Sequence, residues 1–454
     1  MGFGEVRGIR NALAAITALR KRRPLVAILQ VAGLAVAAWL AGCGTAALLT
    51  YSPRDPDGEV PPIPGSPIRH VIVIMQENRT FDNLFHGYPG ADTAQSGMSN
   101  GVEVPLTPVS LAELQNLDNS HPGWWQDWDN GKMDGFARAS YNPPTLAYSY
   151  VPEQEVEQYW TMARQYVLGD RMFQSNTGPS FPAHQYMIAA QSALVVDNPD
   201  SEQWGCDAPP GSTAAVLGPY GTELPGIFPC FDYSTTADLL DERGVTWRYY
   251  SPPSYDGIIY SISAYQAIRH IRYGADWTND VITPQTQVLT DIQNGELAQV
   301  TWIIPDGAHS DHPGSGSLEG PDWVASIVNV VGQSKFWNST AIFISWDDWG
   351  GLYDHVVPPK LDAMGPGFRV PLLVVSAYAK PGYISHNAHE SSGFIAFIEH
   401  NFGLRSLDQR DAVSDDFADC FDYSKKPRSF APIPTKVPIE VLIHEKPNGP
   451  PDTD

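Results

Sequence analysis

Two adjacent aspartates have the type and spacing that could do chemistry. Asp347 and Asp348 follow residues 340–345, a β-branched and aliphatic run typical of a fully buried strand, and Gly350 and Gly351 allow a sharp turn behind them. Ligands of open α/β sheets bind at the carboxyl ends of strands, where adjacent carboxylates favour a hard divalent cation. Asp is also common in turns for local reasons, so the pair alone could be a structural turn.

A second strand end offers the same kind of ligand. Residues 70–75 form a mostly apolar run of strand length, and Glu77 and Asn78 follow it. Carboxylate and amide oxygens are the atoms that a hard cation takes from a protein. A helix cap formed by these two residues is the structural alternative.

Ser180 stands where a helix is predicted to begin. Gly178 and Pro179 favour a tight turn, and Pro182 suits the first turn of a helix that continues to about residue 190. A serine at this position is most often an N-cap. It could instead be a nucleophile whose phosphoryl adduct is stabilised by free backbone N–H groups and the positive helix end.

The elements that must position these residues alternate along the chain. No internal repeat, zinc-type Cys/His spacing or nucleotide-type glycine loop is present, and Trp124, Trp125 and Trp128 could wall a substrate cleft or simply pack in the core. The alternation predicts one α/β domain with a parallel-rich sheet over residues 68–454, with insertions. Further strands are predicted at 246–250, 299–304 and 369–377, and helices at 153–168, 235–243, 323–331 and 391–402.

The charge balance excludes one class of partner. The chain has 28 basic and 51 acidic residues, for a net charge of −23. Binding to a nucleic-acid backbone needs clustered Lys and Arg, so we expect no nucleic-acid partner. Small phosphorylated substrates remain compatible, because one local metal ion can overrule the overall field.

The N-terminus has the pattern of an export signal. Residues 1–43 contain six basic residues and one acidic residue, followed by an apolar run over 25–40 that ends in Ala41-Gly42-Cys43. This pattern resembles a bacterial lipoprotein signal with Cys43 as the lipidated residue, and an uncleaved signal anchor is the alternative. Residues 44–67 are predicted to be a flexible tether. Both alternatives place the body outside the cytoplasm, membrane-anchored at the cell surface or in the periplasm, or secreted.

Three cysteines remain in the body. In an oxidising compartment Cys206 and Cys230 could close a loop across a Pro/Gly-rich insertion, which would leave Cys420 unpaired.

Several of these motifs occur together in the order of a known family. The chain resembles the bacterial phosphoesterase family, which holds phospholipases C and the acid phosphatases similar to them. The resemblance spans nearly the whole mature chain. The matching motifs lie at residues 77–82, 178–182, 310–313, 346–348, 354–359 and 367–371, and similarity continues over 398–417.

The resemblance implies an alkaline-phosphatase-like, three-layer αβα sandwich with a divalent metal ion, whose identity and number stay open. The implied metal ligands are Glu77, Asn78, Ser180, Asp347 and Asp348, with Ser180 also the nucleophile. His121, His312 and His355 are implied to contact phosphate or assist proton transfer. Asp311 and Asp354 are expected to orient neighbouring histidines, and His184, one helical turn after Ser180, is a weaker candidate.

The expected function is metal-dependent hydrolysis of phosphoric esters through a phosphoseryl intermediate, with a small phosphorylated molecule or a phospholipid as substrate. Ser180 stands where the phospholipase branch usually has threonine, and the chain is shorter than that branch, so a phosphomonoesterase of the acid-phosphatase type is favoured. Thr80, where the family usually has serine, keeps the hydroxyl. A phospholipase C is the alternative within the enzyme class. A lipoprotein that binds metal or phosphate without chemistry is the alternative outside it.

Overall fold

A computed structural model describes the chain at Ile63 and over residues 65–113, 115–139, 145–253 and 263–446. The predicted signal segment and nearly all of the predicted tether lie outside these residues. The backbone N–H of Ile63 donates to the carbonyl of His400 at 3.0 Å, and Ser66 Oγ donates to Asn401 at 2.8 Å. Ile63 and Ser66, from the predicted tether, therefore contact the body. Among the residues that the structure describes, no helix combines the length and apolarity needed to cross a bilayer.

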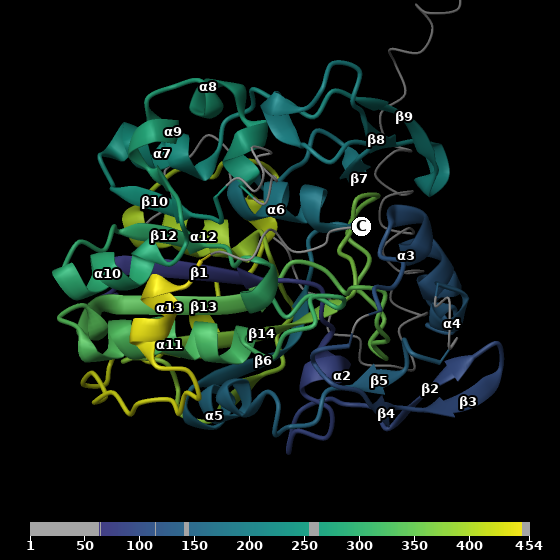
Figure 1. Cartoon of the computed structure of the whole chain (residues 1–454), viewed down its shortest axis with the longest axis horizontal. Coiled ribbons are helices and arrows are strands. Elements are labelled where there is room, and N and C mark those ends of the chain that lie inside the picture. The colour runs from purple at the N-terminus through teal and green to yellow at the C-terminus, as the bar shows by residue number, and fades with distance from the viewer. Residues whose placement is uncertain (1–62, 64, 114, 140–144, 254–262, 447–454) are drawn as a thin grey trace, which may run out of the picture. The chain divides into compact units, whose positions relative to one another are not determined.

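A nine-stranded sheet forms the centre of the described body (Figure 1). All neighbouring strands pair in parallel except β14, which runs antiparallel to both of its neighbours. The parallel-rich sheet predicted from the sequence is therefore confirmed. Its order is β11 (Val281–Ile282), β10 (Trp247–Tyr250), β12 (Val300–Ile303), β1 (His70–Gln76), β13 (Thr340–Trp346), β14 (Arg369–Ser376), β6 (Val167–Phe173) and β15 (Tyr383–Ser385), with β16 (His389–Glu390) also paired to β6.

The register of β1 and β13 decides where their ends lie. The two strands pair from His70 opposite Thr340 to Gln76 opposite Trp346, and every residue of β13 is buried. Because the strands are parallel, Glu77 and Asp347 leave the sheet side by side. The apolar runs read from the sequence thus form neighbouring strands whose polar ends meet.

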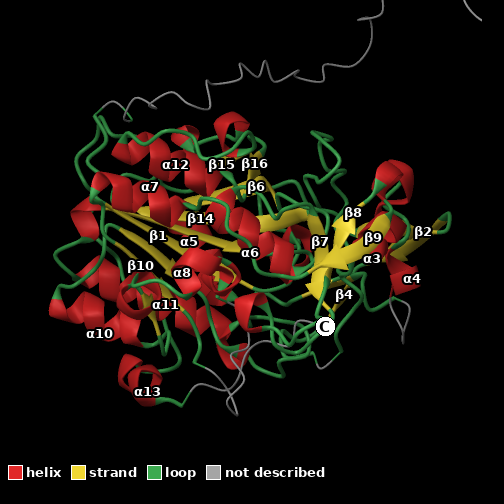
Figure 2. Cartoon of the chain, turned by 90° about the horizontal axis from the view of Figure 1, so that it is seen from above, coloured by secondary structure: helices red, strands yellow, loops and turns green. Residues whose placement is uncertain are grey.

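Helices cover both faces of the sheet, which confirms the three-layer αβα sandwich. In Figure 2, α7 and α12 lie on one side of the strands and α10 and α11 on the other. The predicted helices at 235–243, 323–331 and 391–402 are all present. The helices are α2 (Phe81–Leu84), α3 (His121–Trp128), α4 (Phe136–Ala139), α5 (Glu157–Gln165), α6 (Ser180–Ala189), α7 (Thr236–Arg243), α8 (Arg269–Arg272), α9 (Asp276–Asn279), α10 (Gln287–Asn294), α11 (Gly320–Gln333), α12 (Gly393–Phe402) and α13 (Ile439–His444).

One predicted helix was too long and concealed a strand. The helix expected over 153–168 is α5, and Val167 already belongs to β6. β6 contains Asp170 and Arg171, which interrupt the apolar pattern of a buried strand. Asp170 is fully buried and accepts a hydrogen bond from the backbone of Asp92 at 2.9 Å, so a tertiary partner supports a polar residue inside this strand.

Smaller elements gather beyond one end of the central sheet. Both views place α3, α4, β2 and the three-stranded sheet β7–β9 on that side (Figures 1 and 2). These insertions lie outside the regular alternation of strands and helices. Their strands are β2 (Ser96–Ser99), β3 (Val102–Pro105), β4 (Thr107–Pro108), β5 (Ser149–Tyr150), β7 (Val195–Pro199), β8 (Ala214–Leu217) and β9 (Glu223–Ile227).

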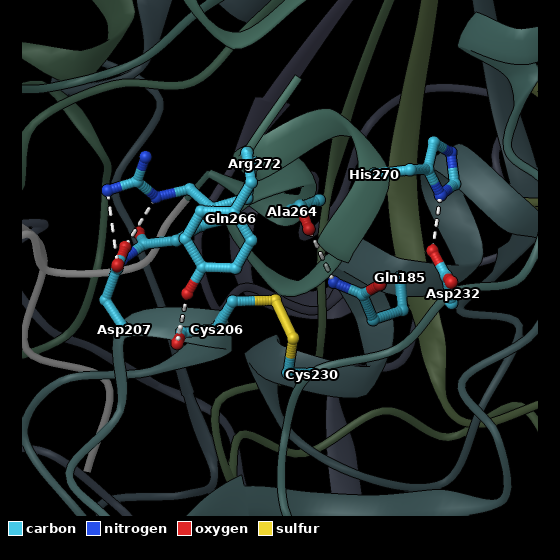
Figure 3. Close-up of a disulfide and its surroundings, with 10 residues drawn as sticks. Gln185, Cys206, Asp207, Cys230, Asp232, Ala264, Gln266, His270 and Arg272 are labelled. Carbon is cyan, nitrogen blue, oxygen red and sulfur yellow. Dashed lines mark hydrogen bonds and ion pairs between the residues drawn. A yellow bond between two sulfur atoms is a disulfide. The ribbon is translucent and has the colours of Figure 1, made fainter.

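The suggested disulfide between Cys206 and Cys230 is present (Figure 3), and Cys420 is a buried free thiol. The bridge closes the loop that contains β8 and β9. Beside it, the Asp207 carboxylate accepts hydrogen bonds from Arg272 at 2.6 and 3.2 Å and from Gln266 at 3.0 Å. The insertion is therefore fixed to α8 and to the turn before it.

We expect reduction of this disulfide to lower the free energy of unfolding by about 3 kcal/mol, because the bridge removes loop entropy from the unfolded chain over a sequence separation of 24. Chemical denaturation with and without reductant measures the change. The Cys206→Ser/Cys230→Ser variant is the control and should not respond to reductant. A parent equally stable in both conditions would contradict the prediction.

Candidate active site

Four segments that follow strands meet at one edge of the sheet. β12, β1 and β13 are parallel neighbours, and β6 runs in their direction because antiparallel β14 separates it from β13. The residues after these strands therefore emerge on the same side. The antiparallel direction of β14 also returns the connection from β13 to this edge, so residues 349–368 stay close to it.

Three buried carboxylates gather there around Ser180. Glu77, Asp347 and Asp348 are each at most 1% exposed. Ser180 Oγ lies 3.4 Å from Glu77 Oε2 and 3.4 Å from Asp348 Oδ2. His184 Nε2 lies 3.3 Å from Glu77 Oε1 and 3.7 Å from Asp347 Oδ2. The sequence ranked His184 as a weaker candidate, but the structure places it in the centre of this cluster.

Hydrogen bonds orient both aspartates. Asp347 Oδ1 accepts from the backbone N–H of Asn78 at 2.9 Å, and Asp348 Oδ1 accepts from Gly350 N at 2.7 Å. Asn119 Nδ2 donates to both oxygens of Asp348 at 3.2 Å. The sequence analysis assigned no role to Asn119. The sequence shows only that this amide side chain stands two residues before His121. Glu77 Oε1 and Asp347 Oδ2 are left buried without a hydrogen bond.

Asn78 occupies a strained position beside these carboxylates. Its φ is +58°, and both polar atoms of its side chain are buried without a hydrogen bond. Gly350 makes this close approach possible, because a Cβ there would lie 2.5 Å from the Asn78 carbonyl oxygen. Together with the two free carboxylate oxygens, the Asn78 amide forms a buried set of donor atoms with the chemistry of a hard-cation site.

No Lys or Arg of the described residues compensates the charge of the cluster. Burial, and then repulsion from Asp347, raise the pKa of Glu77 to about 8. The same two causes raise the pKa of Asp348 well above its usual range. In the described part of the chain, no Lys or Arg is ion-paired with these carboxylates. The cluster must therefore hold protons or a cation.

Ser180 begins α6, as predicted, but the helix end offers fewer donors than expected. The backbone N–H of Phe181 is bonded to Asn198 Oδ1 at 2.9 Å, Pro182 has no N–H, and Ala183 N is 3.3 Å from the carbonyl of Pro179. Fewer free N–H groups than predicted are therefore available at this helix end, because Phe181 and Ala183 already have partners.

The turn before Ser180 is rigid. Gln174 Nε2 and Asn176 Nδ2 each donate to the carbonyl of Gly178 at 3.0 Å. A Cβ on Gly178 would lie 1.8 Å from the carbonyl oxygen of Val196, so only glycine fits here. These contacts fix the position from which Ser180 enters the cluster.

His121 lies beside this turn with both ring nitrogens occupied. Nδ1 is 2.9 Å from the carbonyl oxygen of Thr177, which can only accept, so Nδ1 carries a proton. Trp125 Nε1 donates to His121 Nε2 at 3.1 Å. Nε2 also lies 3.2 Å from the carbonyl oxygen of Gly221. The side chain therefore connects α3 to the residues before Ser180.

His312 is fully buried in the loop after β12. Its Nδ1 lies 2.5 Å from the carbonyl oxygen of Pro313, which leaves Nε2 as the proton-accepting atom of the neutral ring. The loop contacts the site directly, because the backbone N–H of Glu77 donates to the carbonyl of Ser310 at 2.9 Å.

The sequence suggested that Asp311 orients a neighbouring histidine, but its carboxylate bonds to other residues in the structure. Its Oδ2 accepts from Tyr159 at 2.6 Å, from Trp346 at 3.2 Å and from Gln76 at 3.3 Å. These bonds tie the loop to α5 and to the ends of β13 and β1. The role of Asp311 is therefore to fix the loop.

His355 belongs to a second carboxylate cluster. Its Nδ1 is 2.6 Å from Asp82 and its Nε2 is 3.0 Å from Asp92, and despite burial the hydrogen bond to Asp82 raises the pKa of His355 to about 9. Asp354 instead receives two hydrogen bonds from Arg369, at 3.0 and 3.1 Å. The expectation that Asp354 orients His355 is thus wrong, because buried Arg369 engages that carboxylate.

The tryptophans of α3 line a cavity beside the site, with a volume of about 470 Å³. Thr177 lines it as well, which connects the cavity to the turn that precedes Ser180. The hypothesis that these tryptophans wall a cleft agrees with the structure.

Comparisons with known proteins give a consistent picture. The sequence model of the phosphoesterase family matches residues 68–405. Phospholipase C B of Mycobacterium tuberculosis is 24% identical over 441 residues, covering 82% of this chain and 81% of the relative. The hemolytic phospholipase C of Pseudomonas aeruginosa is 24% identical, covering 78% and 56%, and non-specific phospholipase C6 of Arabidopsis thaliana is 24% identical, covering 81% and 75%.

Solved structures show only weak likeness. A protein of the alkaline phosphatase superfamily from Vibrio parahaemolyticus is 9% identical, with a TM-score of 0.41 over 81% of this chain and 75% of that one. The fold described above therefore rests on its own strand order and layers. The family match, by contrast, covers most of the sequence and includes every residue of the carboxylate cluster. The chain therefore belongs to the phosphoesterase family and is a phosphoric ester hydrolase.

Proposed function

We propose that the enzyme cleaves phosphoric esters with Ser180 as the nucleophile, in a site that holds a divalent metal ion. The observation that carries this proposal is the position of Ser180 Oγ, buried 3.4 Å from both Glu77 and Asp348. A hydroxyl among carboxylates that lack a Lys or Arg partner suits a metal-assisted nucleophile. A protein that only binds metal or phosphate would not need it.

The proposed metal ligands are Glu77, Asn78, Asp347, Asp348 and Ser180. The buried oxygens without hydrogen bonds on the first three fit a hard cation, as does the excess of negative charge. When bound, the ion would offset that charge, neutralise phosphate oxygens and lower the pKa of the serine hydroxyl. His184 joins this set as a ligand or as a hydrogen-bonding partner of Glu77, because its Nε2 faces the same space.

The histidines then take different proposed roles. Ser180 Oγ gives up its proton and forms a bond to phosphorus while the bond to the leaving oxygen breaks, and that oxygen takes up a proton. Water then loses a proton and bonds to phosphorus, the bond to Ser180 Oγ breaks, and the serine oxygen regains a proton. His312 is the candidate for the proton transfers because the loop that carries it contacts the site, through the bond from the Glu77 backbone N–H to the carbonyl of Ser310. His121 holds the Thr177 turn, and His355 supplies positive charge to the second cluster.

Two substrate classes remain candidates. The relatives named phospholipase C support cleavage of a phospholipid phosphodiester. Ser180, where that branch usually has threonine, supports a phosphomonoesterase. The chemistry at Ser180 is common to both, so the choice depends on groups around the cluster. The predicted signal at residues 1–43 supports export and anchoring to a membrane, where either class of substrate is found.

Replacing the nucleophile should remove activity. We expect Ser180→Ala to lower kcat for p-nitrophenyl phosphate or for a phosphodiester by at least about 10³-fold, because no other hydroxyl occupies that position. Ser406→Ala is a matched control, because Ser406 is also buried and its Oγ makes no hydrogen bond. Parental turnover by Ser180→Ala would show that another group is the nucleophile.

The metal-free protein should become less stable as the pH rises. The pKa of Glu77 is about 8 in the folded protein and 4.5 in a model peptide, so the folded state binds more protons between these values. Stability is therefore lost as the pH increases through that range. Thermal unfolding with chelator at pH 5.5 and 8.5 tests this, and a divalent cation should raise the melting temperature more at pH 8.5. Glu77→Gln should weaken the dependence of the melting temperature on pH. If the dependence is unchanged in that variant, it arises from another ionisable group.

The substrate class can be decided with paired esters. Purified full-length protein is assayed with p-nitrophenyl phosphate and p-nitrophenyl phosphorylcholine, with and without chelator. Preferred turnover of the diester, lost on chelation, would identify the phospholipase C type. Preferred turnover of the monoester would identify the phosphatase type. Turnover of neither would leave the binding-only alternative.

A further inference from the structure

The chemistry proposed above does not use the cavity beside Thr177. Its walls come from α3, from the turn at residues 219–221 and from the loop at residues 358–366. We propose that this cavity receives a flat, apolar, ring-containing substituent of the phosphoric ester, so that aryl esters are preferred substrates. The proposal rests on hydrolysis at Ser180.

The cavity and Ser180 share one structural support. Thr177 lines the cavity and precedes Ser180 by three residues, in the turn fixed by Gln174 and Asn176. The carbonyl of Thr177 is bonded to His121, which in turn accepts from the indole N–H of Trp125, another lining residue. A substituent held in the cavity is therefore positioned relative to the nucleophile through a short, rigid chain of contacts.

The lining favours a neutral aromatic group. Trp124 and Trp128 are stacked with ring centroids 5.5 Å apart, and Trp125 stands nearly perpendicular to both. The indole N–H of Trp125 is already bonded to His121, so its ring surface is what remains for a ligand. Pro358, Pro359 and Pro366 add further apolar surface.

The charged lining residues do not favour a cationic substituent. Lys360 would repel one. Asp362 is already engaged, because its carboxylate contacts Arg410 at 2.6 Å and accepts from the backbone N–H groups of Met364 and Gly365 at 2.8 and 3.0 Å. The tryptophans are therefore better suited to an uncharged ring than to a quaternary ammonium group.

Tyr220 provides a second, independent observation at the cavity. Its side chain is 100% exposed, and its φ is +63°, a conformation that is unfavourable for a bulky residue. A glycine would adopt this turn more easily, and the exposed ring gains no packing in return. In the cavity lining, however, the ring can cover a bound aromatic group. Strain and exposure at this tyrosine thus point to a role in binding.

The size of the cavity limits the ligand. A volume of about 470 Å³ lies in the lower part of the range of roughly 300–1,000 Å³ for small-molecule sites. It suits one compact organic group. Two long acyl chains of a phospholipid would have to extend beyond it.

The test compares 1-naphthyl phosphate with glycerol phosphate in full-length protein. For the parent, we expect kcat/KM to favour the naphthyl ester. Tyr220→Gly should reduce this preference about five- to tenfold, mainly through KM, because an aromatic contact is lost. Its melting temperature should be unchanged or higher, since glycine relieves the strain. Trp128→Ala should reduce the preference in the same direction.

Leu194→Gly is the matched control. Leu194 also has a positive φ, of +64°, and is 56% exposed, but it does not line the cavity. The Leu194→Gly variant should leave the substrate preference unchanged. If the parent hydrolyses both esters and neither cavity variant changes their ratio, the cavity proposal is overturned while hydrolysis at Ser180 stands. If the parent hydrolyses neither ester, the proposed function fails and the cavity proposal with it.

Discussion

The burial of three carboxylates at adjoining strand ends is the constraint on which the site depends. Each buried ionised carboxylate costs several kcal/mol unless it is compensated. The parallel register of β1 and β13 nevertheless forces Glu77 and Asp347 together, and Asp348 follows directly. The bonds from Asn119, Gly350 and the backbone of Asn78 fix the orientation of the aspartates but supply no net positive charge. A cation is therefore the simplest group that would make this arrangement stable when the carboxylates are ionised.

In the second acidic cluster, basic side chains of the protein itself bond to the buried carboxylates. Asp82 and Asp354 are as deeply buried as Glu77, but the fully buried Arg369 bonds to both of them. His355, with its pKa raised to about 9, adds a second positive charge at neutral pH. Arg369 and His355 therefore offset the negative charge of Asp82 and Asp354 from within the chain. The contrast explains why similar residue types at the same sheet edge are assigned to metal binding in one place and to structural support in the other.

The sequence was sufficient to predict the structural features that depend on neighbouring residues. Apolar runs over 70–75 and 340–345, which Glu77 and Asp347 follow, identified the two central strands, and a turn with Gly178 and Pro179 placed Ser180 at a helix start. Other features depended on tertiary contacts. Asp170 in β6 and the position of His184 opposite Glu77 could not be read from neighbouring residues, because partners distant in the sequence support them. The orientation of His355 by Asp82 and Asp92 and the bonds of Arg369 to Asp354 have the same origin.

In the proposed function, chemistry and substrate choice depend on different parts of the fold. The carboxylates and Ser180 follow strands of the central sheet, whose register leaves little freedom. The cavity is built from α3, the loop at 358–366 and the turn at 219–221, and that turn lies within the segment closed by Cys206 and Cys230. Substitutions in these insertions can change the ester that fits without moving the nucleophile. The proposed reaction therefore depends on the carboxylate cluster and Ser180, whereas the proposed substrate preference depends on the surrounding insertions.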